Sequence, residues 1–326
     1  MTARHWWTYV LLIVALAAVS AASVAVGTTG VPFSLTWYGL SLPRLLMSVL
    51  AGASLSIAGA MFQSLFRNPL ASPYTLGVSS GASLGAAVII MLVGGGLWHG
   101  LPLVSLAAFA GAVVCMSAVY TVASLRRSGG IGTLLLAGVT IGFICSALIV
   151  MVLFLAQRYD LEAILQWTMG SLQIVGLDPV YETLAMAALG GGVAAWLHRD
   201  LDLLMMGEVV AAGRGVSVRR SRLLIYVFAS LLTAGVVAHC GPIGFVGLMV
   251  PHLARYLVGP THRYLLPACA LAGAAFLPLC DLAARNAMWW ITGDSRQVPV
   301  GVLTNLVGGA FFLYLLLRGR GGIGGL

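Results

Sequence analysis

The sequence predicts an all-α polytopic membrane protein with about ten transmembrane helices. The chain is 60% hydrophobic and 8% charged, with a mean hydropathy of +1.01, whereas a soluble domain carries about 25% charged residues. Its apolar residues form runs of roughly 20, the length that crosses a bilayer as a helix. The runs lack the polar–apolar alternation of a membrane barrel, and backbone in lipid must bond internally, so we expect helices.

Ten apolar runs follow one another with short connections. They cover 6–26, 42–65, 75–95, 102–124, 133–156, 179–198, 223–239, 243–258, 264–283 and 298–317. The first run also fits a signal peptide, because Arg4 and His5 precede it. Its length, and the span that soon follows, favour a membrane helix. The run 243–258 is the weakest, because it is short and contains Pro251. We expect a single transmembrane domain over 1–326.

The arginines orient this bundle, because cytoplasmic loops are enriched in basic residues. All 17 basic residues are arginine. With the N-terminus in the cytoplasm, thirteen fall inside and only Arg44, Arg158, Arg285 and Arg296 fall outside. We therefore expect a multi-pass membrane protein with both termini in the cytoplasm. The absence of lysine excludes a P-loop, and scattered arginines argue against a nucleic-acid partner.

Two connections are long enough to interact with partners. The stretch 199–222 holds 8 of the 26 charged residues and lies on the predicted cytoplasmic side. A short helix is expected within it, ended by Gly213 and Gly215. On the other side, the apolar residues of 157–178 suit either an interfacial helix or a re-entrant turn.

A weak sequence similarity between two parts of the chain suggests an inverted repeat. Ala-Gly-Ala at 58–60 precedes Pro-Leu-Ala at 69–71, and Ala-Gly-Val at 234–236 precedes Pro-Ile-Gly at 242–244. The first block begins outside and the second inside. Helices 2–5 and 7–10 would then be related as inverted repeats.

Two features inside the spans suggest function, and each has a structural alternative. Ser79, Ser80, Gly81 and Ser83 give one helix a small-residue face, which serves either close helix packing or a transport path. Asp281 is an acid within a span, with Arg285 four residues later. The two form either a structural ion pair or part of an ion-coupling site.

Several stretches, taken together and in order, resemble the permease subunit of ABC transporters for iron–siderophore, haem and vitamin B12 uptake (the FecCD type). They are 67–71 with 76–81, 167–172, 241–248 with 250–252, 262–267, and 299–302 with 311–318. The resemblance implies a second permease copy, as a homodimer, and two cytoplasmic ATPase subunits that hold ATP and Mg. An extracytoplasmic substrate-binding protein completes the set. The chain itself would bind no cofactor or metal and catalyse no covalent chemistry.

The resemblance also implies a bacterial or archaeal cytoplasmic membrane as the location, and it assigns docking roles to residues. The ATPase would dock on Gly207, Glu208, Ala211, Ala212, Gly213, Arg214 and Gly215, although the family usually has Leu-Gly where this chain has Arg214-Gly215. The binding protein would dock on Arg44, Arg285 and Arg296. The translocation path or gate would include Ser79, Ser80, Gly81, Ser83, Gly130, Gly132 and Thr133.

The expected activity is import of a metal chelate by alternating access, an iron–siderophore complex first, then cobalamin or haem. The alternative is a secondary transporter that needs no ATPase, for which the sequence offers little beyond Asp281. An intramembrane enzyme would need a paired nucleophile and base or a metal cluster, neither of which is visible in the sequence. A channel would conduct without ATP.

Overall fold

The apolar runs form the helices of the computed structural model, which describes residues 3–25, 37–93, 102–125, 131–293 and 296–318. Seven helices of this described part are long and apolar enough to span a membrane. They are α1 (Ala3–Ala25), α2 (Leu42–Phe66), α4 (Pro102–Leu125), α5 (Ile131–Leu155), α10 (Val218–Cys240), α12 (His262–Thr292) and α13 (Val300–Arg318).

Three further helices account for the remaining predicted spans. α7 (Asp178–Trp196) bends by 57° into α8 (His198–Met206), and the pair qualifies as one broken span. α3 (Val78–Val93) and α11 (Val246–Val258) are shorter apolar helices. With these three, the helices match the ten predicted runs in order, and the all-α fold class is confirmed.

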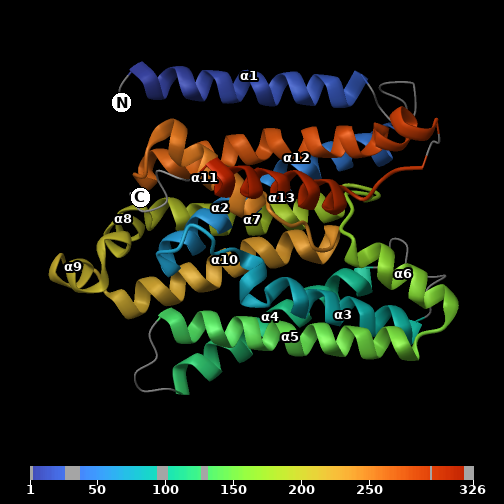
Figure 1. Cartoon of the computed structure of the whole chain (residues 1–326), viewed down its shortest axis with the longest axis horizontal. Helices are drawn as coiled ribbons and strands as arrows, with labels where there is room; N and C mark the ends of the chain where they lie inside the picture. Colours follow the sequence, from blue (N-terminus) through green and yellow to red (C-terminus); the bar gives the residue numbers. More distant parts are fainter. Residues whose placement is uncertain (1–2, 26–36, 94–101, 126–130, 294–295, 319–326) are drawn as a thin grey trace.

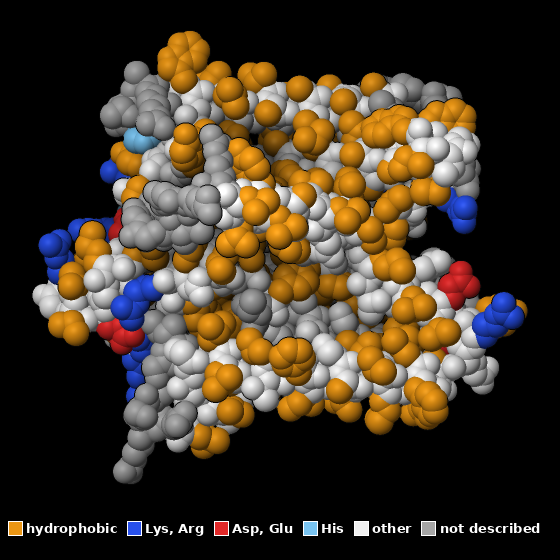
Figure 2. All heavy atoms as spheres, viewed as in Figure 1, with side chains coloured by type: hydrophobic (Ala, Val, Ile, Leu, Met, Phe, Trp, Pro, Cys, Tyr) orange, Lys and Arg blue, Asp and Glu red, His pale blue; other side chains and the backbone are white. Residues whose placement is uncertain are grey.

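Two short helices mark opposite ends of the bundle (Figure 1). α9 (Glu208–Gly213) lies at one end, called here the α9 end, and α6 (Arg158–Thr168) lies at the other, the α6 end. α1 begins and α13 ends at the α9 end. Charged side chains gather at the two ends in Figure 2, and hydrophobic side chains dominate the belt between them. This distribution is that of a protein that spans a membrane.

α2 is the central helix. In its most apolar window 67% of the residues are buried, against 11% for α1 and 17% for α5. Its glycines allow other backbones to touch it. A methyl group added at Gly52 would lie 2.0 Å from the Gly273 carbonyl oxygen of α12, and one at Gly59 would lie 1.7 Å from that of Gly247 in α11. Small residues permit such approach between membrane helices.

Two irregular breaks interrupt the helical course. The first, 67–77, contains the short 3₁₀ helix η2 (Pro73–Leu76) and separates α2 from α3; the second, 241–245, separates α10 from α11. Both breaks contain proline, which cannot continue a regular helix: Pro69 and Pro73 in the first, and Pro242 in the second. α2 runs toward the α9 end and α10 runs away from it (Figure 1). This order of broken helices, in opposite directions, fits the predicted inverted repeat.

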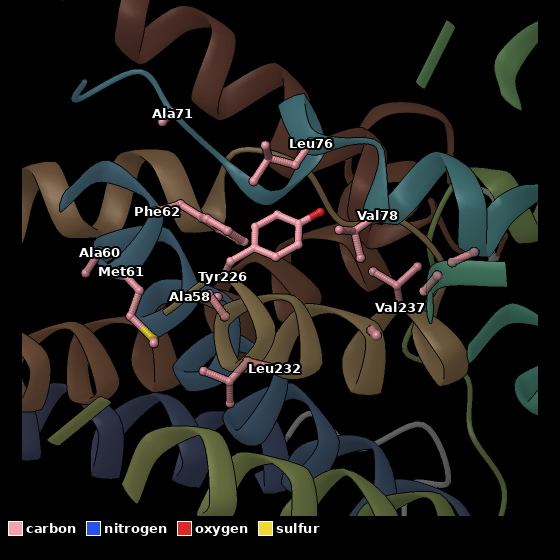
Figure 3. Packing of buried hydrophobic residues seen from close by; sticks show 14 of the residues in the cluster. Ala58, Ala60, Met61, Phe62, Ala71, Leu76, Val78, Tyr226, Leu232 and Val237 are labelled. Carbon is pink, nitrogen blue, oxygen red and sulfur yellow. The ribbon is translucent and has the colours of Figure 1, made fainter. Parts of the chain in front are cut away.

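From Ala71 on, the first break lies inside the protein, whereas Leu70 is 57% exposed. Ala71 and Leu76 are buried, and Figure 3 shows Leu76 beside the ring of Tyr226 of α10. The Tyr226 hydroxyl donates to the Met116 carbonyl oxygen at 3.1 Å. Its ring packs edge-on against that of Phe62, with the two ring centroids 6.3 Å apart. Irregular backbone is tolerated at membrane depth where protein covers it, and this core provides that cover.

The segment 169–177 also folds into the protein rather than lying on it. Its Ser171 N–H donates to the Cys240 carbonyl oxygen at 2.7 Å, while Leu172 is fully buried. Its Gly176 N–H donates to the Gly39 carbonyl oxygen at 3.0 Å, within the π-helical turn η1 (Trp37–Ser41) that precedes α2. Together with α6, this segment forms the α6 end. The predicted outer connection is therefore part helix and part half-buried turn, in which Leu172 is buried and Val175 is exposed.

Candidate functional site

The clearest candidate interaction surface is the projecting α8–α9 corner. Gly207, with φ of 121°, turns the chain between α8 and α9, and Gly215, with φ of 85°, ends the motif. Large apolar side chains are exposed here, outside the hydrophobic belt. Val209 is 87% exposed, Met206 66% and Val210 42%. An apolar patch in such a place is typical of a contact with another protein or with a membrane surface.

The seven predicted ATPase-docking residues all lie in this corner. Ala211 faces inward and is fully buried, so it anchors α9. Ala212, Gly213, Arg214 and Gly215 are exposed. The structure thus gathers them on one motif, although their docking role stays a prediction.

Glu208 fixes the position of α9 rather than facing outward. Its Oε1 accepts from Arg67 Nη2 at 3.0 Å and contacts Arg222 as well. Arg67 follows the last residue of α2, and Arg222 lies near the start of α10. Exposed ion pairs each contribute only about 0–1 kcal/mol, but one carboxylate here joins three segments. The sequence did not reveal these partners, because Arg67 is 141 residues away.

A second polar group ties α8 to the bundle. Asp202 Oδ1 lies 2.6 Å from His262 Nδ1, and His262 Nε2 lies 2.6 Å from Ser64 Oγ. The order Ser–His–Asp matches that of a hydrolase triad. However, Ser64 is fully buried and its hydroxyl also lies 2.8 Å from its own helix, at the Ala60 carbonyl oxygen. A nucleophile must reach its substrate, so this arrangement is structural.

At the α6 end, two predicted binding-protein contacts converge on Asp281. Arg44 donates to its carboxylate from Nε at 3.1 and 3.2 Å and from Nη2 at 2.8 Å. Arg285 Nη2 lies 3.1 Å from the other oxygen. Gln297 accepts from Arg44 Nη1, and Ser23 accepts from Arg285 Nη2.

This cluster is deeply buried. The side chains of Arg44, Asp281 and Arg285 are only 10%, 2% and 7% exposed. The sequence anticipated the Asp281–Arg285 pair but not Arg44, whose partner is 237 residues away. The docking role of both arginines stays a prediction, and in this conformation Asp281 engages them. Arg296, the third predicted contact, is exposed.

The predicted path residues divide into two groups. Gly81 packs on α4, where an added methyl group would lie 2.6 Å from the Gly111 carbonyl oxygen. Ser79 and Ser83 are also buried, whereas Ser80 is partly exposed. At the start of α5, Gly132 is exposed with open space beside it, and Thr133 is partly exposed. Gly130 lies outside the described residues. The path role of all of these stays a prediction.

Within the described ranges, no group of three His, Cys, Asp or Glu side chains is placed to hold a metal ion. The five cysteines are buried and free. Neither feature adds a candidate site to those above.

The fold and these surfaces define a class: a polytopic helical membrane permease that presents a docking corner outside its apolar belt. The chain belongs to the FecCD transport family, whose sequence profile matches residues 8–318. It is 39% identical over 277 residues to the cobalamin import system permease protein BtuC of Halobacterium salinarum, covering 85% of this chain and 72% of that protein.

A second relative and a solved structure support the same family. The hemin transport system permease protein HmuU of Yersinia pestis is 37% identical over 293 residues, covering 87% of this chain and 84% of that protein. A solved inward-facing structure of a transporter assigned to the metal-chelate ABC type matches with a TM-score of 0.85 at 27% identity, covering 96% of this chain and 99% of that one. The protein is therefore a permease subunit of an ABC importer of the metal-chelate, vitamin B12 and haem class.

Proposed function

We propose that this chain pairs with a second copy of itself to form the membrane path of an ATP-driven, binding-protein-dependent importer. Two ATPase subunits, which hold ATP and Mg, would bind at the α9 end. A binding protein would deliver a metal chelate at the α6 end. Hydrolysis in the ATPase would switch the path between outward and inward openings, and the α9 end would face the cytoplasm.

The observation that carries this proposal is the exposed apolar corner at α8–α9. Its three most exposed apolar side chains, Met206, Val209 and Val210, lie beyond the belt that lipid would cover. The ion pairs of Glu208 hold the corner in place without a partner. A preorganised apolar surface of this kind suits a permanent protein partner, because little ordering entropy is lost on docking.

The homodimer is supported by how little of α5 and α13 the chain itself covers. Only 17% and 22% of their most apolar windows are buried. Both helices carry small or polar residues on uncovered positions, including Gly132 and Thr140 of α5 and Asn305 of α13. Such residues suit a helix interface or an aqueous path better than lipid.

The cargo is proposed as a metal chelate rather than a particular compound. An iron–siderophore complex is our first candidate, with cobalamin and haem behind it. The two relatives described above are named for cobalamin and hemin, which supports testing both of these beside it. Binding of the partner protein to a panel of ferric siderophores, cobalamin and hemin would identify the cargo.

The docking surface is tested by Val209→Glu. A charge buried against an apolar partner should lower ATPase co-purification from detergent about tenfold or more. Val175→Glu is the matched control, since Val175 is 69% exposed at the α6 end. It should leave co-purification unchanged. Parental co-purification of Val209→Glu would remove α9 from the interface. Glu208 is a poorer choice, because its loss would release Arg67 and Arg222.

The alternative, a secondary transporter, would need an ionisable group available for coupling. Asp281, a buried acid inside a span, already pairs with Arg44 and Arg285. Cargo uptake by vesicles that contain this chain alone, driven by a proton gradient without any ATPase, would overturn the proposal. No uptake without the ATPase, and uptake with it, would support it.

A further inference from the structure

The start of α12 is capped by a residue of α8. The first N–H groups of a helix have no partner within the helix, and Thr261 at the N-cap makes no side-chain hydrogen bond. Asp202 fills this role, because its Oδ1 accepts from the His262 backbone N–H at 2.8 Å. A carboxylate also interacts favourably with the positive end of a helix dipole. The segment that carries the docking corner therefore caps the N-terminal end of α12.

Two further polar contacts lead from the same Asp202 carboxylate through His262 to α2. A carboxylate only accepts hydrogen bonds, so Nδ1 is the donor at 2.6 Å. On the other side of the ring, Nε2 lies 2.6 Å from the Ser64 hydroxyl oxygen. His262 is 1% exposed and Ser64 is fully buried. One chain of hydrogen bonds, Asp202–His262–Ser64, thus joins α8, the start of α12 and the last turns of α2.

α2 and α12 are in contact from one end to the other. Near the middle, Gly52 and Gly273 bring the two backbones together. At the α6 end, Arg44 of α2 pairs with Asp281 of α12. From His262 to Asp281 the helix rises about 28 Å at 1.5 Å per residue. The pair is tied at both ends by polar groups and in the middle by direct backbone contact.

We propose that Asp202, His262 and Ser64 are positioning residues that couple the docking corner to the α2–α12 pair. The inference rests on the proposed function and deepens it. A displacement of α8–α9 by the ATPase reaches α12 through Asp202 and α2 through His262. The two helices then move together and carry the displacement to the Arg44–Asp281 cluster, beside the predicted binding-protein site.

Two conservative variants test the coupling in the complete complex of permease, ATPase and binding protein in proteoliposomes. Ser64→Ala removes the partner of His262 Nε2, and Asp202→Asn removes the charge of the cap. Ser56→Ala is the first control, because the Ser56 hydroxyl donates to Gly52 of its own helix at 2.7 Å, as Ser64 does toward Ala60. Asp200→Asn is the second, because Asp200 accepts from Ser221 of α10.

The expected result is a loss of coupling without a loss of assembly. Ser64→Ala and Asp202→Asn should keep ATPase co-purification and basal ATP hydrolysis. Cargo transported per ATP should fall about tenfold, within the usual range of coupling between sites. The controls should stay within about twofold of the parent. The double variant should lose little more than either single variant, since both break one network.

Two results would overturn the proposal. One is parental transport per ATP in Ser64→Ala. The other is a loss of transport that only follows the loss of assembled complex. If Asp202→Asn does not assemble, Ser64→Ala decides alone, because it leaves the cap of α12 in place. Failure of the proposed function itself looks different: the parent chain would then bind no ATPase.

Discussion

The buried cluster at the α6 end makes a sharp prediction for Asp281→Asn. The carboxylate accepts three hydrogen bonds from Arg44, with donor–acceptor distances between 2.8 and 3.2 Å. It also forms an ion pair with Arg285 at 3.1 Å. An asparagine keeps one acceptor oxygen, which Arg44 can still use. Its amide nitrogen then lies where Arg285 donates, so two donors face each other.

The cost follows from burial. With the two arginine side chains 10% and 7% exposed, water cannot replace the lost partner. Breaking a buried pair by removing one member costs about 3–5 kcal/mol. For a chain of this size, about 2 °C of melting temperature corresponds to 1 kcal/mol. We therefore expect Asp281→Asn to lower the melting temperature by roughly 6–10 °C.

Thermal unfolding in detergent measures this shift. Asp178→Asn is the control, because Asp178 is exposed in the first turn of α7 and should cost about 1 kcal/mol at most. A second change, Arg285→Met in the Asp281→Asn chain, should recover part of the loss, because it removes the unpaired guanidinium. If Asp281→Asn melts within 2 °C of the control, about 1 kcal/mol, the cluster does not stabilise the fold as argued.

Three more predictions concern single residues. Gly59→Ala should destabilise the protein by about 1–3 kcal/mol or prevent its folding, because the added methyl group would lie 1.7 Å from the Gly247 carbonyl oxygen; parental melting in detergent would contradict this. Tyr226→Phe should cost about 1 kcal/mol, since it removes only the hydrogen bond to Met116; a melting shift above about 6 °C would mean that the hydroxyl does more. Arg296→Glu should reduce binding-protein-stimulated ATP hydrolysis, because Arg296 is exposed at the predicted docking face and a reversed charge there would repel acidic residues of the partner; equal stimulation would exclude it from the interface.

The sequence predicted the helices well because bilayer thickness imposes a length and a composition on each span. It placed α3 and α11 correctly even though both are short, because the prolines around Pro69 and Pro242 mark breaks on one side of each. It could not foresee that the first break is covered by the Tyr226 core. That depends on α10, which is far away in the chain and meets the break only after folding.

The roles of individual residues were harder to predict from the sequence, because they also depend on contacts between distant parts of the chain. Local spacing revealed the Asp281–Arg285 pair, four residues apart. Arg44, which lies 237 residues from Asp281, was assigned to the outer surface by charge and position alone. Burial changes what a test of that assignment means. Arg44→Glu would place two carboxylates together inside the protein, so a loss of activity would report the fold rather than docking.

The Ser64–His262–Asp202 network shows how burial decides between two chemistries that share one geometry. No nucleophile–base pair was visible in the sequence, because the serine and histidine are 198 residues apart and the histidine and aspartate are 60 residues apart. The fold brings all three within hydrogen-bonding distance, in the order that activates a hydrolase serine. Yet Ser64 has no exposed surface, so no acyl group can approach it. The same bonds that would activate an exposed serine here join three helical segments, which is the role that a coupling element of a permease requires.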